Sequence, residues 1–89
     1  MGPFKPSFAP QFLEDHKYWT VHNQRVAKKG DSLVKATLND PFTGIGKPEI
    51  LRFGVLKACG SRRITGEHRI VDKIQKQKIE FLICRYRYE

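Results

Sequence analysis

The spacing of hydrophobic positions changes about halfway along this chain. Between residues 10 and 22, large side chains recur at helical spacing, and Pro10 suits the first turn of a helix. These positions are Phe12, Leu13, His16 and Trp19. Asn23 can cap a second helix that runs to about Leu38, before Asp40-Pro41 ends it. The apolar face of this second helix would comprise Val26, Leu33, Val34 and Leu38.

After residue 49 the pattern alternates, as is typical of strands. A loop with two glycines and two prolines, residues 41–49, separates the two regimes. Gly66 and residues 75–77 are turn signals, so the pattern predicts strands near 50–53, 61–65, 67–74 and 78–86. In residues 1–9, Pro3 and Pro6 allow only an edge strand or an irregular lead-in. We therefore predict one α+β domain over residues 1–89, with two N-terminal helices packed on a small antiparallel-rich sheet.

Alternation also predicts which strand residues share a face. Glu67 and Arg69 fall on one face of the third predicted strand, so they are neighbours that can form a pair. In the last strand, Ile79, Phe81 and Ile83 should point one way. Leu82 and Cys84 should then point the other way.

Composition narrows the partners and the chemistry. Seventeen Lys and Arg face nine Asp and Glu, which gives a formal charge of +8 and favours a polyanionic partner. Neither Cys59 nor Cys84 has a neighbour at zinc spacing, so we expect no metal and no cofactor. No stretch is long and apolar enough to span a membrane, and no signal-peptide core opens the chain. A cytoplasmic protein is expected.

The basic residues gather toward the end of the chain, where a strand-rich surface could bind a phosphate backbone. They belong to three short motifs: Ser61-Arg62-Arg63-Ile64-Thr65, Glu67-His68-Arg69-Ile70-Val71 and Arg85-Tyr86-Arg87-Tyr88. Arg62 and Arg63 are either solvated charges on a strand or contacts to RNA or to the ribosome. Lys47 and Arg85 are further candidates for binding phosphate.

These motifs, in this order, resemble those of the YoeB/Txe branch of the RelE-type toxins, which are small ribonucleases of bacterial toxin–antitoxin pairs. The resemblance covers nearly the whole chain. It includes Tyr18-Trp19 and Cys84-Arg85-Tyr86 as well as the loop Pro41-Phe42-x-Gly44-x-Gly46-Lys47-Pro48-Glu49. Each motif alone is weak evidence for the family, but their combination at nearly constant spacing is specific for it.

The resemblance implies metal-free cleavage of messenger RNA in the ribosomal A site, through attack by the RNA 2′-OH. It implies that Glu49 is the general base, Arg69 binds the phosphate and Glu67 supports them. Arg52 and the closing Tyr88 complete the implied catalytic set. The implied partners are the ribosome and a YefM-like antitoxin, which would provide any contact with operator DNA. A homodimer is compatible with this group.

Four departures from the family pattern distinguish this chain. Arg87 replaces the histidine that serves as general acid, Gly60 replaces a common tryptophan, and Asp72 replaces a common aromatic residue. One residue is also inserted between Glu49 and Ser61. Because an arginine rarely gives up a proton, the loss of the histidine leaves two readings open. The chain is either an active or attenuated nuclease that uses Arg87 and Tyr88, or an inactive homologue that acts by binding antitoxin or ribosome.

Overall fold

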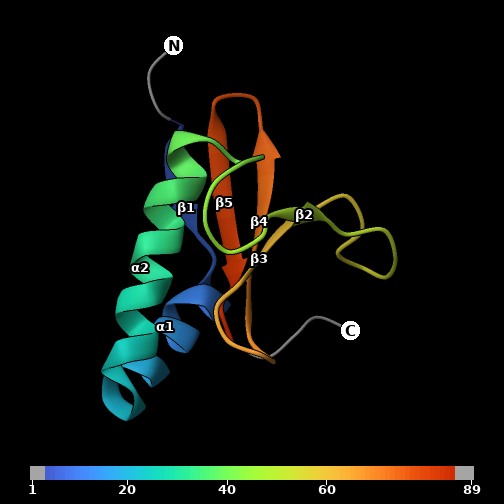
Figure 1. Ribbon diagram of the computed structural model, residues 1–89. Coiled ribbons are helices and arrows are strands. Elements are labelled where there is room, and N and C mark those ends of the chain that lie inside the picture. The colour runs from blue at the N-terminus through green and yellow to red at the C-terminus, as the bar shows by residue number, and fades with distance from the viewer. Residues whose placement is uncertain (1–3, 86–89) are drawn as a thin grey trace.

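Two helices cover one face of a five-stranded sheet (Figure 1). The structure, a computed structural model, describes residues 4–85. Its elements are β1 (Lys5–Phe8), α1 (Pro10–His22), α2 (Gln24–Asn39), β2 (Glu49–Ile50), β3 (Gly60–Arg63), β4 (Arg69–Gln75) and β5 (Lys78–Ile83). The strand order is β1-β5-β4-β3-β2; β1 pairs with β5 in parallel, and every other pair is antiparallel. The predicted α+β architecture is confirmed, and β1 is the edge strand that the prolines allowed.

Both helices begin and end close to the predicted residues. Pro10 opens α1, and the Asn23 side chain caps α2 by accepting a 3.3 Å hydrogen bond from the Val26 amide. The buried face of α1 differs from the prediction, because Leu13 is 57% exposed and Asp15 is buried. Within residues 4–85, neither helix combines the length and the hydrophobicity that a membrane crossing needs.

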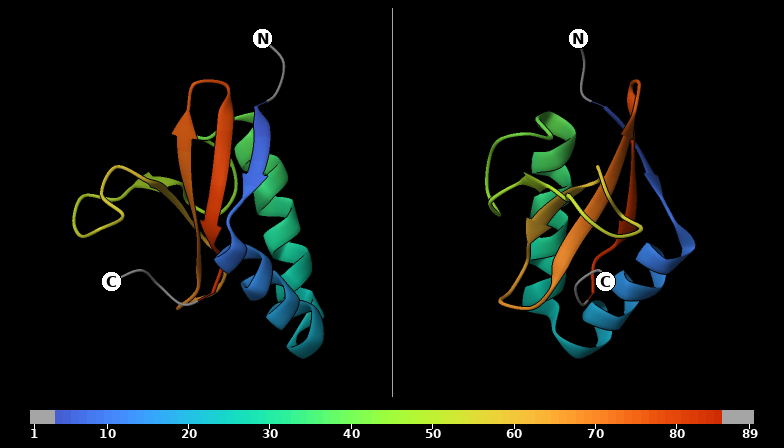
Figure 2. Two further views of the ribbon diagram at one scale, coloured as in Figure 1. Left: turned by 180° about the vertical axis from the view of Figure 1, so that it is seen from behind. Right: turned by 90° about the vertical axis from the view of Figure 1, so that its right-hand side faces the viewer.

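The main core lies between the helices and the sheet (Figure 2). Its fully buried centre comprises Leu33, Ile70, Ile79 and Phe81, and Phe12 and Trp19 of α1 pack around it. A smaller cluster on the other face contains Leu51, Cys59 and Val71. The sheet is therefore apolar on both faces, but only the helix side is covered by regular structure.

A β-bulge reverses the predicted facing of the last strand. Val71 pairs with Ile83 and Asp72 with Phe81, so Leu82 is an extra residue in β5. Alternation holds up to Phe81 and then shifts by one residue. Cys84 therefore joins the helix-side core, and Ile83 packs on the opposite cluster. The prediction that Ile83 shares a face with Phe81 is wrong for this reason.

The second and fourth strands, β2 and β4, differ from the prediction in ways that affect candidate site residues. The segment after Ile50 leaves the sheet and forms an irregular loop, in which Phe53 and Val55 are 83% and 91% exposed. Glu67 lies in a turn rather than in β4, because the Thr65 hydroxyl accepts hydrogen bonds from the Glu67 and His68 amides. The expected pairing of Glu67 with Arg69 is therefore wrong.

Helix α1 holds the backbone where β5 ends. A carboxylate oxygen of Asp15 accepts a hydrogen bond of 3.0 Å from the Cys84 amide, and Trp19 Nε1 donates to the Cys84 carbonyl at 2.8 Å. The guanidinium of Arg85 then stacks on the ring of Tyr18, 3.4 Å from its centroid. These contacts set the direction in which the chain leaves the sheet.

Two buried charged residues, Arg62 and Asp72, lie in the adjacent strands β3 and β4. Asp72 is 2% exposed, and burial raises the pKa of its carboxyl to about 6, although the neighbouring Arg62 opposes this shift. The Asp72 charge also helps to raise the pKa of the Cys59 thiol, although burial is the larger cause of that shift. Because the folded pKa exceeds the unfolded value, the folded protein binds the proton more tightly.

We predict that this group makes the protein more stable in mild acid than at neutral pH. Stability that depends on Asp72 should be greatest below the unfolded pKa and be lost as pH rises through about 6. Between pH 5 and pH 7 the free energy of unfolding should fall by about 1 kcal/mol more in the natural protein than in Asp72→Asn. Urea titrations at the two pH values measure this difference. An equal change in the free energy of unfolding between pH 5 and pH 7 in both proteins would contradict the prediction.

Candidate active site

The carboxylate of Glu49 and the guanidinium of Arg69 form an ion pair on the sheet face opposite the helices. Glu49 Oε2 lies 3.1 Å from Arg69 Nη1, and the same nitrogen donates a 3.1 Å hydrogen bond to Ser61 Oγ. The pairing register explains this contact, since Glu49 pairs with Ser61 in β3 and Ser61 with Val71 in β4. Three segments far apart in sequence thus place an acid, a hydroxyl and an arginine together.

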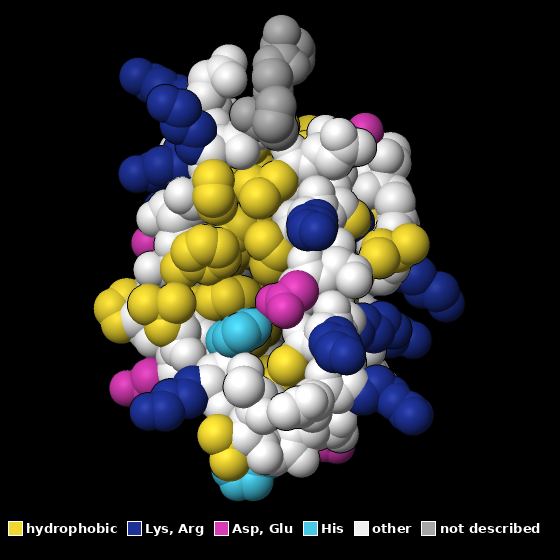
Figure 3. All heavy atoms as spheres, turned by 90° about the vertical axis from the view of Figure 1, so that its left-hand side faces the viewer, with side chains coloured by type: hydrophobic (Ala, Val, Ile, Leu, Met, Phe, Trp, Pro, Cys, Tyr) yellow, Lys and Arg dark blue, Asp and Glu magenta, His cyan; other side chains and the backbone are white. Residues whose placement is uncertain are grey.

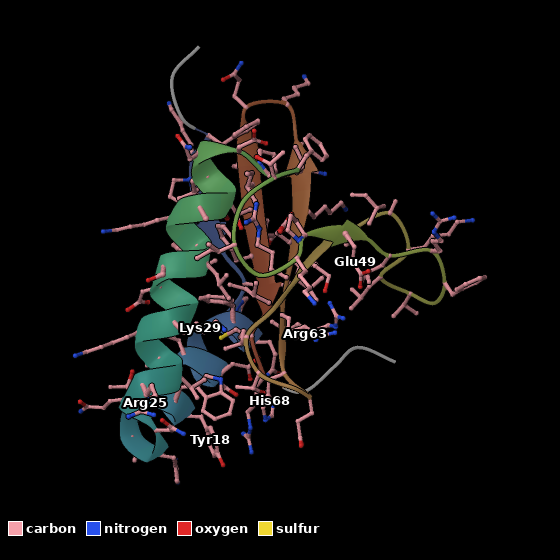
Figure 4. The ribbon with its side chains drawn as sticks, in the orientation of Figure 1. Tyr18, Arg25, Lys29, Glu49, Arg63 and His68 are labelled. Atoms are coloured by element: carbon pink, nitrogen blue, oxygen red, sulfur yellow. The ribbon has the colours of Figure 1, made fainter. Side chains whose placement is uncertain are left out.

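Arg63 adds a second cation to this group. It is exposed, lies directly opposite Arg69 in the β3–β4 register, and shares the face of Ser61. Figure 4 shows Arg63 and Glu49 on the same side of the molecule, away from the helices. Like charges placed directly across two strands repel. An anion between them would relieve that repulsion, so this face favours a phosphate.

Lys47 and Arg52 flank Glu49 on either side in the chain. Both are exposed, and Lys47 has a left-handed backbone with φ of 51°. Arg52 begins the loop that follows Leu51, whose backbone is tied to Cys59 and Ala58 by hydrogen bonds of 2.9 and 2.8 Å. Both side chains are therefore positioned by loops rather than by the sheet.

Arg62 is not on the surface, which contradicts its predicted contact with RNA. It is 1% exposed, and its terminal nitrogens donate to the carbonyls of Asp40, Thr43 and Ile45 at 2.7, 2.8 and 2.8 Å. Burial lowers the pKa of its guanidinium, whereas the nearby acids Asp72 and Asp40 oppose that effect. In the Arg62-Arg63 pair, the first arginine is structural and only the second faces solvent.

The remaining predicted site residues lie elsewhere or outside the described residues. Arg85 is on Tyr18 of α1, and Glu67 is exposed in the turn before β4. His68 packs edge-on against Trp19, with ring centroids 4.7 Å apart. Arg87 and Tyr88 lie outside the described residues, so their predicted roles stay predictions.

The sequence did not predict that Ser61 would contact Arg69, although Ser61 belongs to the Ser-Arg-Arg motif. Nothing in the sequence separates it from an ordinary strand serine, because only the register brings its hydroxyl to Arg69. Within residues 4–85, no cluster of three or more His, Cys, Asp or Glu side chains could hold a metal ion. The chemistry available on this face is that of a carboxylate base beside guanidinium groups, which suits proton abstraction next to a phosphate.

Comparison with known proteins assigns the family. The model for the YoeB-like toxin of bacterial type II toxin–antitoxin systems matches residues 8–88. Toxin YoeB of Escherichia coli K12 is 41% identical over 75 residues, which cover 84% of this chain and 88% of that protein. The YoeB dimer from Staphylococcus aureus matches with a TM-score of 0.84 at 35% identity, covering 98% of this chain and 100% of that one.

A solved complex of YoeB with YefM from the same organism matches with a TM-score of 0.81 at 38% identity, over 98% of this chain and 100% of that chain. Both the sequence and the fold therefore agree over nearly the whole chain, including the segments that carry Glu49, Ser61 and Arg69. The chain belongs to the YoeB-like toxin family of bacterial type II toxin–antitoxin systems.

Proposed function

We propose that this toxin is an endoribonuclease that cuts messenger RNA in the ribosomal A site. The observation that carries the proposal is the ion pair between Glu49 and Arg69, with Ser61 on the same guanidinium nitrogen. Glu49 keeps a side chain that is 51% exposed, so its carboxylate is open to a substrate. The Arg69 side chain is 20% exposed, and its hydrogen bond to Ser61 holds it against the sheet.

In the proposed reaction, Glu49 removes the proton of an RNA 2′-OH. The 2′ oxygen attacks the adjacent phosphorus, and the bond to the 5′ oxygen breaks to leave a 2′,3′-cyclic phosphate. Arg69, with Arg52, stabilises the charge that builds on the phosphate oxygens. Arg63 and Lys47 bind the flanking phosphates. The departing 5′ oxygen takes a proton from Tyr88 or is stabilised by Arg87.

The ribosome supplies what this shallow face lacks. Among the described residues, Glu49 and Arg63 are exposed on the sheet face, and Arg69 is partly buried beside Glu49. Such a site binds a flexible RNA weakly, and a substrate already held in an A site brings its 2′-OH and phosphate into position at a lower entropic cost. The +8 charge favours association with this polyanionic particle.

We infer that an antitoxin of the YefM type neutralises the toxin, by analogy with the YoeB–YefM complex. A hollow of about 520 Å³ lies between α1, α2 and β1 and offers an apolar contact surface (Figure 3). Its lining comprises Phe8, Phe12, Leu13, His16, Asp31, Val34 and Lys35. The net positive charge would favour an acidic partner segment. Any contact with operator DNA would be made through that partner, and the YoeB dimer keeps self-association open for test.

We predict that Glu49→Gln and Arg69→Ala each reduce RNA cleavage on programmed ribosomes at least about a hundredfold. The first change removes the base, and the second removes the cation that binds the phosphate. Primer extension on a defined messenger measures the rate. Glu14→Gln and Arg25→Ala, which alter exposed residues on the helices, are matched controls and should cut at the natural rate. Undiminished cleavage by both site variants would overturn the assignment.

We also predict that Arg87→His raises the cleavage rate by roughly tenfold, because a histidine with a pKa near 6.5 can donate a proton at neutral pH. The gain should shrink as pH rises above about 7, where the acid form is depleted. The rate on ribosomes at several pH values tests this. An unchanged rate would mean that Tyr88 already supplies the proton. A lower rate would mean that Arg87 acts as a charge clamp.

A further inference from the structure

The segment Asp40–Pro48 closes around the side chain of Arg62. Three of its carbonyl oxygens, those of Asp40, Thr43 and Ile45, accept hydrogen bonds of 2.7–2.8 Å from the guanidinium. These carbonyls come from different points of one loop, and a planar group with donors in a fixed fork can reach all of them. We call this segment and its guanidinium the arginine cradle.

Two glycines permit this close approach. Gly44 has φ of 107°, and a Cβ there would lie 3.2 Å from Arg62 Nη1. Gly46 has φ of 85°, and a Cβ there would lie 2.7 Å from Leu33 Cδ2 and 3.1 Å from Arg62 Cβ. A residue with a side chain at either position would have a strained backbone and would crowd Arg62. The Gly44-x-Gly46 spacing therefore reflects packing on an arginine.

The arginine cradle leads directly into the proposed base. The Arg63 amide donates a 2.7 Å hydrogen bond to the Gly46 carbonyl, which places the loop three residues before Glu49. Strand β2 is only two residues long, so its own ladder constrains Glu49 weakly. The position of Glu49 in its ion pair with Arg69 thus depends on the loop that precedes Glu49.

A buried carboxylate, that of Asp72, acts electrostatically on the cradle, although the described residues Asp72 and Arg62 form no direct ion pair. Asp72 is 2% exposed and interacts electrostatically with Arg62. It fits because Gly60 lies directly opposite in the β3–β4 register, where a Cβ would come within 2.8 Å of Asp72 Oδ1. Asp72 and Gly60 are the two departures from the aromatic residues that are common in the family pattern. The structure places these departures against each other, which indicates that they act together.

We propose that Arg62 is a positioning residue for Glu49, and that the Gly60–Asp72 pair supplies the counter-charge that holds Arg62 in the cradle. Arg62 makes no contact with the substrate in this role. Its effect passes through the backbone of residues 40–48 to the carboxylate of Glu49. The consequence for cleavage rests on the proposed function, whereas the effect on loop order does not.

The first test is Arg62→Lys, which keeps the charge but cannot reach three separated carbonyls. Amide exchange of Arg63, which donates to Gly46, should become at least about tenfold faster, and the backbone order parameters of residues 42–48 should fall below about 0.6. Amides inside α2 should keep their protection. Cleavage on ribosomes should lose at least about tenfold in kcat, with KM within about threefold. Arg25→Lys is the matched control and should change none of these values.

The second test is Asp72→Asn, which keeps the shape of the side chain and removes the counter-charge. Its effect should fall on the same amides as that of Arg62→Lys. In the double variant the two effects should not add, because both act on the order of the same loop. This variant also carries the test if Arg62→Lys does not fold.

Unchanged loop order and unchanged Arg63 exchange in folded Arg62→Lys would overturn the proposal, as would fully additive effects in the double variant. Failure of the proposed function gives a different pattern. In that case the natural protein and Glu49→Gln would cut RNA equally, while the loop in Arg62→Lys would still lose order.

Discussion

The burial of the Arg62 guanidinium is the constraint on which the rest of this site depends. A charged group loses several kcal/mol of solvation when it is taken from water into a protein interior. Here that loss is offset by three backbone carbonyls and by two carboxylates nearby, those of Asp40 and Asp72. The carbonyls belong to the loop that precedes Glu49. The same interaction that makes the burial tolerable therefore shapes the backbone that presents the proposed base.

The second element of the site is the register of three strands. Glu49 in β2 meets Ser61 in β3, and Ser61 accepts a hydrogen bond from Arg69 in β4. Cross-strand neighbours on one face lie within reach of long side chains, so a short ladder is enough to bring an acid to an arginine. The opposite face of the same strands carries Arg62 and Asp72. One face of the sheet holds the proposed catalytic residues, and the other holds the proposed positioning residue.

Helix α1 links the opposite edge of the fold to the end of the chain. Asp15 and Trp19 hold both polar groups of the Cys84 peptide backbone, and Tyr18 carries the stacked Arg85. The bulge in β5 turns Cys84 toward the helix and makes these contacts possible. Contacts with α1, rather than strand pairing, thus position the backbone of Cys84 and the side chain of Arg85.

The sequence by itself determined the order of elements, the α+β class and the family, whereas the roles of Glu49 and Arg69 stay predictions that follow from the resemblance. Periodicity and turn residues are local signals in the sequence. A family can likewise be recognised from an ordered set of short motifs without knowledge of tertiary contacts. Tertiary structure alone decided that Arg62 is buried, that Glu67 is in a turn, and that Ser61 reaches Arg69. Identical residue types in adjacent positions point to opposite faces of a strand, so burial depends on which face the helices and loops cover. The bulge at Leu82 likewise has no signature in the alternation, because it arises from the pairing of two strands.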